Sequence, residues 1–358
     1  MTRSSITRSS FTSVFILSLM ASGAMAMTNN QGIINQSGDD NLATIVQAPA
    51  TETELVVATI TQAGDFNDAT IIQEQGSESN VGSIHQGGND NVANLTQSDF
   101  SENNDGSINQ SGDGNDADLF QEDNSENNVA SIDQSGDGNR GEIEQDENSA
   151  DNEATLVQSG NDNDGDITQE RDTAHNVATL DQSGDGNMGE IDQDDNSENN
   201  VASINQSGDD NEASIQQRNV SEENDAMITQ VGDGNFAEIL QDDQSELNVA
   251  SVHQGGDGNL ASVLQGADSE ENEARVNQSG DENEAYIDQD SSEQNFASVD
   301  QSGDRNEALI DQFDSADNRA MVNQSGDDNL AEVYMDGHVF DVVDIVQSGN
   351  NNQAFYNP

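Results

Sequence analysis

Apolar residues recur at every second position in short segments of this chain, and the segments themselves recur. The common phrase is Asn-x-[Ala/Gly]-x-[Ile/Leu/Val]-x-Gln, as in residues 41–47 (NLATIVQ) and 200–206 (NVASINQ). The positions between are mostly Ser, Thr, Asp, Glu or Val. A period of two is typical of a half-buried β-strand and not of a helix. We therefore expect a β-strand at each phrase.

Two kinds of link join the strands. The short link reads Gln-x-Gly-x-x-Asn and occurs fourteen times, from Gln36 to Gln347, at a spacing of 26 once, 24 nine times and 23 three times. The longer link is exemplified by residues 193–200. Both are rich in Gly, Asp, Asn and Ser, which favour turns. The repeating unit is therefore strand–turn–strand–turn.

A unit of this size cannot bury its inner face alone, but stacked copies can. The sequence predicts an all-β fold, a two-sided parallel β-solenoid of about 14 coils, in which each strand pairs in register with its equivalent in the next coil. At the usual strand spacing such a rod would be about 65–70 Å long. Its ends would leave open strand edges, so that solenoids of this kind tend to grow into fibres.

Identical amides stacked at strand spacing can hydrogen-bond along the axis as ladders, which satisfies groups that are costly to bury alone. The turn glycines suit a backbone conformation that other residues resist. The expected ladder positions include Gln36, Asn41, Ile45, Gln47, Gln110, Asn115, Gln121, Gln134, Asn139, Gln145, Gln206, Asn211, Ile215, Gln217, Gln278, Asn283, Ile287 and Gln289, and the turn glycines include Gly38, Gly112, Gly136, Gly208 and Gly280.

Composition alone would give a different impression. The 358 residues include 72 Asp plus Glu but only 8 Lys plus Arg, for a net charge of −64, and 31% are hydrophobic. Such values are typical of a disordered acidic chain. The charge argues against nucleic acid and anionic membranes as partners, and the lack of Cys excludes disulfides and thiolate metal sites. A disordered matrix protein, however, has no reason to keep fourteen registered aliphatic positions.

Acidic residues recur in the short link, whose fourth position is Asp in eleven of the fourteen copies. Stacked at ~5 Å, such carboxylates repel by about 1 kcal/mol each in water, and salt screens them. They could be gatekeepers against premature aggregation or an adaptation to a saline habitat, and the two interpretations are compatible. The expected gatekeepers include Asp39, Asp113, Asp137, Asp185, Asp233 and Asp281.

The two ends of the chain depart from the repeat. Residues 1–26 combine Arg3 and Arg8, an apolar stretch over 11–20 and an Ala-Met-Ala site, which predicts a secretory signal peptide. A short segment 27–29 precedes the repeats of 30–334, and 335–358 forms a divergent C-terminal coil that could be a cap or a docking surface. No other segment is apolar enough to span a membrane, so we expect an exported protein.

The repeat resembles that of the curlin family, the subunits of bacterial curli amyloid fibres, with the pattern S-x5-Q-x-G-x2-N-x5-Q. Here Q-x-G-x2-N-x5-Q holds in twelve of fourteen copies and fails at Met335 and Pro358. The usual Ser is Asn, as in Asn80, Asn128 and Asn248, and no Gly-rich segment follows the expected signal peptide. The resemblance covers about residues 30–356.

The resemblance implies a secreted, non-enzymatic subunit of extracellular cell-surface fibres that serve adhesion and biofilm matrix. It implies that further copies of the same chain are the chief partner, and that no cofactor is bound. Other curli-type subunits or a nucleator, and an outer-membrane curli-type secretion channel, are implied as further partners. Whether this chain is the major subunit, a nucleator or a minor component stays open.

The sequence fits other classes of protein less well. An acidic secreted solenoid that binds Ca²⁺ without forming fibres is the main alternative, because turns such as 112–116 resemble nonapeptide calcium repeats; those, however, recur every nine residues. An ice-binding solenoid would need regular outward Thr rows, which do not run the length of this chain. The sequence does not indicate a catalytic site, since the four histidines, His85, His175, His253 and His338, form no cluster in it.

Overall fold

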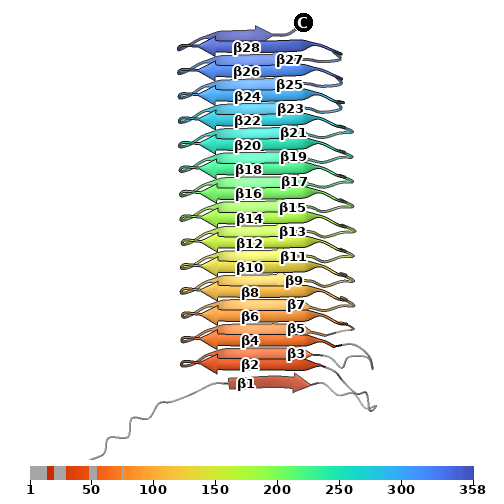
Figure 1. The fold of residues 1–358 in the computed structure, drawn as a ribbon, viewed down its shortest axis with the longest axis vertical. Helices are drawn as coiled ribbons and strands as arrows, with labels where there is room; N and C mark the ends of the chain where they lie inside the picture. Colours follow the sequence, from red (N-terminus) through yellow and green to blue (C-terminus); the bar gives the residue numbers. More distant parts are fainter. Residues whose placement is uncertain (1–13, 20–29, 48–54, 75, 77) are drawn as a thin grey trace, which may run out of the picture.

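A computed structural model describes residues 14–19, 30–47, 55–74, 76 and 78–358. Over these residues the chain is all-β, and its strands alternate between two sheets, one of 15 strands and one of 14. Odd-numbered strands make up sheet A and even-numbered strands make up sheet B. Figure 1 shows the strands stacked one above another along a straight rod, in chain order from the N-terminal to the C-terminal end.

The strands of sheet A are β1 (Val14–Leu19), β3 (Leu42–Gln47), β5 (Asp68–Gln73), β7 (Val92–Gln97), β9 (Asp116–Phe120), β11 (Arg140–Glu144), β13 (Asp164–Thr168), β15 (Met188–Asp192), β17 (Glu212–Gln217), β19 (Phe236–Gln241), β21 (Leu260–Gln265), β23 (Glu284–Asp288), β25 (Glu307–Asp311), β27 (Leu330–Tyr334) and β29 (Gln353–Tyr356). Those of sheet B are β2 (Gln31–Ser37), β4 (Val57–Ala63), β6 (Val81–Gly87), β8 (Asp105–Ser111), β10 (Val129–Ser135), β12 (Glu153–Ser159), β14 (Val177–Ser183), β16 (Val201–Ser207), β18 (Asp225–Val231), β20 (Val249–Gly255), β22 (Glu273–Ser279), β24 (Phe296–Ser302), β26 (Arg319–Ser325) and β28 (Val342–Ser348).

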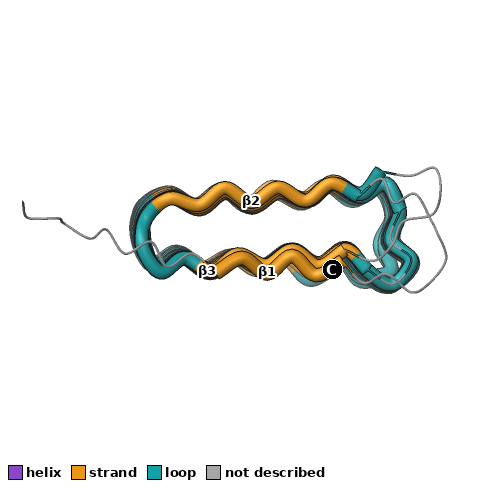
Figure 2. The backbone as a smooth tube through the Cα atoms, turned by 90° about the horizontal axis from the view of Figure 1, so that it is seen from below, coloured by secondary structure: helices purple, strands orange, loops and turns teal. Residues whose placement is uncertain are grey.

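Neighbouring strands in each sheet are parallel and pair repeat on repeat. In the middle of sheet B, for example, Ile204 lies opposite Ile228 and Gln206 opposite Gln230. Viewed along the rod, the two sheets form two flat layers joined by an arc at each side (Figure 2). The predicted fold, a two-sided parallel β-solenoid, is therefore confirmed.

The core is the narrow space between the two layers. The aliphatic and small residues of the strand phrase point into it, and Ile45, Ile215 and Ala237 are at most 2% exposed. Residues between them on each strand face outward, so that burial alternates along nearly every strand. In β3, for example, Ala43, Ile45 and Gln47 are buried, and the residues between them are partly exposed. Few apolar residues suffice because those of the strand phrase lie in continuous buried columns.

Stacking, and not only turn geometry, explains the glycine of the short link. Gly112 has φ +106°, and a Cβ built there would lie 2.0 Å from the carbonyl oxygen of Gly136 in the next coil. Gly208, with φ +110°, would meet Gly232 in the same way at 2.1 Å. A side chain at this position would therefore separate adjacent coils.

The long link contains order that the sequence did not predict. Isolated parallel bridges join equivalent residues of successive long links, such as Glu102 with Glu126 and Glu222 with Glu246. The long link is thus a third, short stacking element at the edge of the solenoid, beside the two sheets.

Both ends of the chain extend the solenoid. Strand β1 lies within the apolar stretch of the expected signal peptide and pairs with β3; the rest of that segment, residues 27–29 and Pro49 lie outside the described residues. The divergent C-terminal segment forms β28 and β29, which keep the register, with Gln347 opposite Gln324. Among the described residues, the structure contains no helix that is long and apolar enough to cross a membrane.

Candidate functional site

The glutamines of sheet B form a hydrogen-bonded ladder along the rod. Gln182 donates from Nε2 to Oε1 of Gln206 at 3.0 Å, and Gln206 donates onward to Gln230 at 3.0 Å. The second N–H of Gln206 reaches the main-chain oxygen of Met188, on the opposite sheet, at 2.9 Å. Each amide therefore joins its own coil to both neighbours and joins the two sheets.

Sheet A carries a matching glutamine ladder. Gln217 donates to Oε1 of Gln241 at 2.8 Å and to the main-chain oxygens of Val201 and Asn224, each at 3.2 Å. The expected ladder glutamines lie in these two columns, and all except Gln36 are at most 2% exposed: Gln47, Gln110, Gln121, Gln134, Gln145, Gln206, Gln217, Gln278 and Gln289.

The asparagine that ends the short link forms a third ladder. Oδ1 of Asn91 accepts from the main-chain N–H of Asn115 at 2.9 Å and from its Nδ2 at 3.2 Å. Nδ2 of Asn115 also donates to the carbonyl of Gly136, one coil further, at 2.9 Å. Asn41, Asn139, Asn211 and Asn283 occupy the same column and are at most 2% exposed.

A fourth column, in the long link, pairs asparagine with a buried hydroxyl. Asn128 donates from Nδ2 to Oγ of Ser149 at 2.7 Å, and its Oδ1 accepts from the N–H of Asn152 at 2.9 Å. Sequence reasoning missed the hydroxyls, although Ser or Thr stands three residues before each asparagine. The buried column consists of Ser101, Ser125, Ser149, Thr173, Ser197, Ser221, Ser245, Ser269, Ser292 and Ser315.

The short-link aspartates are exposed and stack in a column as expected, but they also have a structural role. Oδ1 of Asp137 accepts from the main-chain N–H of Asp113 at 2.9 Å, and Oδ1 of Asp233 accepts from that of Asp209 at 3.0 Å. Where Asn replaces Asp the bond persists, as from the N–H of Asp65 to Oδ1 of Asn89 at 3.0 Å. The acceptor is therefore common to Asp and Asn, and only the charge differs.

A dense group of carboxyls covers the outer face of sheet A between β9 and β15. Glu142 lies directly opposite Asp166, and Asp166 opposite Glu190, on neighbouring strands. Like charges opposite each other in a sheet are destabilising. Arg140 relieves some of the repulsion by pairing with Glu142 at 2.5 Å and with Asp164 at 3.2 Å.

Crowding raises several pKa values in this carboxyl face. Partial burial, with the nearby charge of Glu142, raises the pKa of Glu144 to about 7. Burial followed by repulsion from Glu142 and Glu190 raises that of Asp166 to about 6. Burial and Asp194 raise the pKa of Asp192 to about 7. These groups keep protons at a higher pH in the folded chain than they would in an unfolded one.

In the part of the chain that the structure describes, no group of three or more His, Cys, Asp or Glu side chains is arranged to hold a metal ion. The four histidines stay apart: His85, His175 and His253 are exposed at separate coils, and His338 lies in the last long link beside Asp341, with Nδ1 2.9 Å from Oδ2. The chemistry that the described residues repeat in every coil is therefore amide and main-chain hydrogen bonding.

The ladders stop at two open ends. At the first coil, Oε1 of Gln36 is buried and has no hydrogen-bond partner among the described residues. At the last described coil, Gln347 accepts from Gln324 at 2.9 Å and donates to the main-chain oxygen of Leu330 at 2.9 Å. Each end therefore presents the half of the ladder that the other end lacks.

Comparison with known proteins agrees with this geometry. The family model described as the curlin associated repeat matches two adjacent stretches, residues 270–293 and 293–326. They hold β22 to β26, whose strands pair in the same register as the other coils. No curated protein matches the chain. The ladders and turns of this matched stretch recur from β2 to β29, so the whole solenoid is built from units similar to the curlin associated repeat, which is typical of structural proteins.

Proposed function

We propose that this chain is secreted and assembles into curli-like extracellular fibres, in which solenoids stack on one another along the ladder axis. The observation that carries the proposal is the pair of open ends. A buried acceptor at Gln36 has no partner among the residues that the structure describes, and Ile34 and Ile345, the end members of an aliphatic column, are only partly buried against the core. Stacking of a further coil would satisfy the acceptor and cover both side chains.

Assembly of this kind needs no new fold in the subunit. All strand pairs from β2 to β29 lie within residues 31–356, and β1 contributes pairing to β3 alone. Removal of residues 1–26 as a signal peptide would therefore leave the coils intact and open the edge of β3. The same coil-to-coil contacts that stabilise one chain would then continue from chain to chain.

The biological role follows from the family resemblance. We infer that the fibres serve adhesion, surface colonisation and biofilm matrix at the cell surface, after export through an outer-membrane curli-type channel. Another curli-type subunit could act as nucleator. The acidic turns, by repelling one another, would slow assembly until the chain is outside the cell.

The proposal is tested by incubating the processed chain, residues 27–358, and recording fibre diffraction. We expect a meridional reflection at about 4.7–4.8 Å and an equatorial one near 10 Å. A chain that stays monomeric over days at high protein and salt concentration would overturn the proposal. Stoichiometric Ca²⁺ binding by calorimetry in such a monomer would instead favour the calcium-binding solenoid.

A further inference from the structure

The amide ladders have a direction. In the glutamine columns each Nε2 donates toward the C-terminal end, as from Gln36 to Gln62 at 2.7 Å and from Gln301 to Gln324 at 2.9 Å. The N-terminal end of the rod therefore presents glutamine acceptors and the C-terminal end presents donors. Two N-terminal ends, or two C-terminal ends, cannot continue such a ladder. A C-terminal end can, because its donors meet the acceptors of an N-terminal end.

The two halves of the C-terminal end differ from each other. On the short-link side the repeat is intact: Gln347, Gly349 and Asn352 occupy their usual positions, and Asn352 still bonds to Oδ1 of Asn329 from N at 3.0 Å and from Nδ2 at 2.9 Å. In the preceding coils, Oδ1 of this asparagine accepts from the next coil, and Asn352 is the last of the column.

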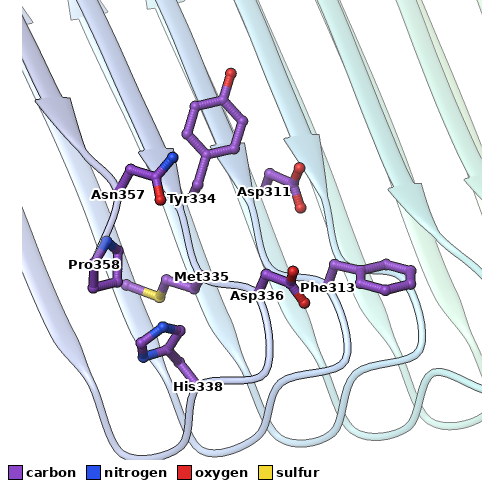
Figure 3. A pocket seen from close by; sticks show the side chains of 8 residues that line it. All are labelled: Asp311, Phe313, Tyr334, Met335, Asp336, His338, Asn357 and Pro358. Atoms are coloured by element: carbon purple, nitrogen blue, oxygen red, sulfur yellow. The ribbon is translucent and has the colours of Figure 1, made fainter.

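On the long-link side the ladders are interrupted. Met335 stands in the glutamine column of sheet A, and its sulfur accepts from Nε2 of Gln312 at 3.7 Å. Its side chain has no N–H with which to donate to a following coil. Pro358 follows in the same column and has neither an amide side chain nor a main-chain N–H. Met335, Pro358 and His338 line one hollow of about 360 Å³ at this corner (Figure 3).

The long-link asparagine column also ends there. Asp341 takes the place of asparagine, and its main-chain N–H donates to Oδ1 of Asn318 at 2.8 Å in the usual way. Its carboxylate keeps an acceptor oxygen. It has no Nδ2 donor with which to reach a hydroxyl in a following coil. Its carboxylate instead contacts His338 at 2.9 Å and the hydroxyl of Tyr356 at 3.5 Å. The long-link half is thus closed by side chains of its own coil.

In the fibre of the proposed function, the C-terminal coil of one copy stacks head to tail on the N-terminal coil of the next. We propose that the amide ladders continue across this joint only on its short-link side. Gln347 would donate to Gln36 of the next copy, and Asn352 would accept from Asn41. This inference rests on the proposed function. It makes each joint weaker than a coil-to-coil contact inside the chain, so that fibres break and elongate at joints.

A cysteine pair tests the direction of the joint, because the chain has no cysteine of its own. In register, Ser348 of one copy would lie opposite Ser37 of the next, while the two are about 60 Å apart within one rod. Fibres grown from Ser37→Cys and Ser348→Cys chains mixed together should give disulfide dimers on mild oxidation. Fibres of either variant alone should give none. The pair Ser111→Cys and Ser135→Cys, opposite each other within one chain, is the control for reactivity.

Dimers in either single variant would overturn the head-to-tail joint, as would the absence of dimers in mixed fibres whose control pair oxidises. If the unsubstituted chain forms no cross-β fibres, the proposed function itself fails, which is a separate result. The two outcomes are therefore distinguishable in one experiment.

Seeded elongation tests which half of the joint is laddered. Gln347→Met should slow elongation about tenfold, as expected for the loss of one buried amide contact of ordinary strength. The triple change Met335→Gln, Asp341→Asn and Pro358→Gln should speed it several-fold by completing the long-link ladders. Equal elongation rates for Gln347→Met and the unsubstituted chain, or no acceleration by the triple change, would overturn the half-laddered joint.

Discussion

The side chain of Asp65 holds the turn of the preceding coil: its Oδ1 accepts a hydrogen bond from the main-chain N–H of Asp39 at 2.7 Å. The same bond joins successive short links along the rod, with Asp or Asn as the acceptor. The aspartate column therefore stabilises the stack through its oxygens and opposes it through its charge. Asparagine separates the two effects, because its side chain keeps the accepting oxygen and lacks the charge.

Neutralising part of this column should speed assembly without loosening the fold. We expect Asp185, Asp209, Asp233 and Asp257, all changed to Asn, to shorten the lag of fibre growth at low ionic strength. The difference should fade in about 1 M salt, where charges are screened over ~3 Å. Growth followed with an amyloid dye across a salt series provides the measurement.

The matched control changes the same four residues to Ala, which removes both the charge and the acceptor. Each lost bond should lower the free energy of unfolding by roughly 0.5–1.5 kcal/mol. If the Asn and unsubstituted chains respond to salt alike, the aspartates are not gatekeepers.

The two glycines of one short link should tolerate the same substitution to different degrees. Gly112→Asn would place a Cβ 2.0 Å from the carbonyl oxygen of Gly136, whereas nothing lies within 4 Å of the Cβ built at Gly114. Gly114 has φ +71°, a value that asparagine tolerates. We expect Gly112→Asn to destabilise the chain by about 2–4 kcal/mol and Gly114→Asn by less than about 1 kcal/mol, as measured by urea unfolding. Similar losses of unfolding free energy in both variants would mean that backbone strain in the turn, and not contact between coils, is the reason for glycine at position 112.

Neighbouring glutamines of β17 offer a similar contrast. Gln217 is buried and bonds to Gln193 and Gln241, each at 2.8 Å, while Gln216 lies on the outer face. Gln217→Met leaves two amides of the ladder short of a partner, so it should cost roughly 1–3 kcal/mol. Gln216→Met should change the free energy of unfolding by less than about 0.5 kcal/mol. A loss at Gln216 as large as that at Gln217 would contradict a structural role for the ladder.

The sequence was sufficient to predict the solenoid because the strand phrase has a period of two and the links recur with it. It was less informative about the long link. The Ser and Thr before each asparagine resemble ordinary turn residues, and only the stacked structure buries Ser149 against Asn128. The carboxyl face was not predicted either. The expected register already places Glu142 opposite Asp166, 24 residues on, but the outward residues vary from coil to coil and have to be compared across repeats. Contacts between coils depend on register, which a single repeat does not reveal.

The carboxyl face predicts a stability that depends on pH. Glu144, Asp166 and Asp192 have folded-state pKa values of about 7, 6 and 7, well above their usual range near 4. A carboxyl with a raised pKa binds protons more tightly in the folded state, so its deprotonation destabilises the fold. The penalty is absent below pH ~4, grows as the pH rises from there to the folded pKa values of about 6 to 7, and is complete above pH ~8. Folding should therefore be more stable at pH 5 than at pH 8.

The expected difference between pH 5 and pH 8 is on the order of 2 kcal/mol, after allowance for solvent screening of these half-exposed groups. The triple change Glu144→Gln, Asp166→Asn and Asp192→Asn should remove most of it. The control changes three exposed turn residues, Asp113, Asp137 and Asp185, to Asn, which removes the same charge but leaves the carboxyl face intact. Urea midpoints of both triple variants, measured at the two pH values, provide the test. The two variants lose the same charge and differ only in the local crowding of the carboxyls that they remove. An equal loss of pH dependence in both would therefore assign the effect to net charge and not to the carboxyl face.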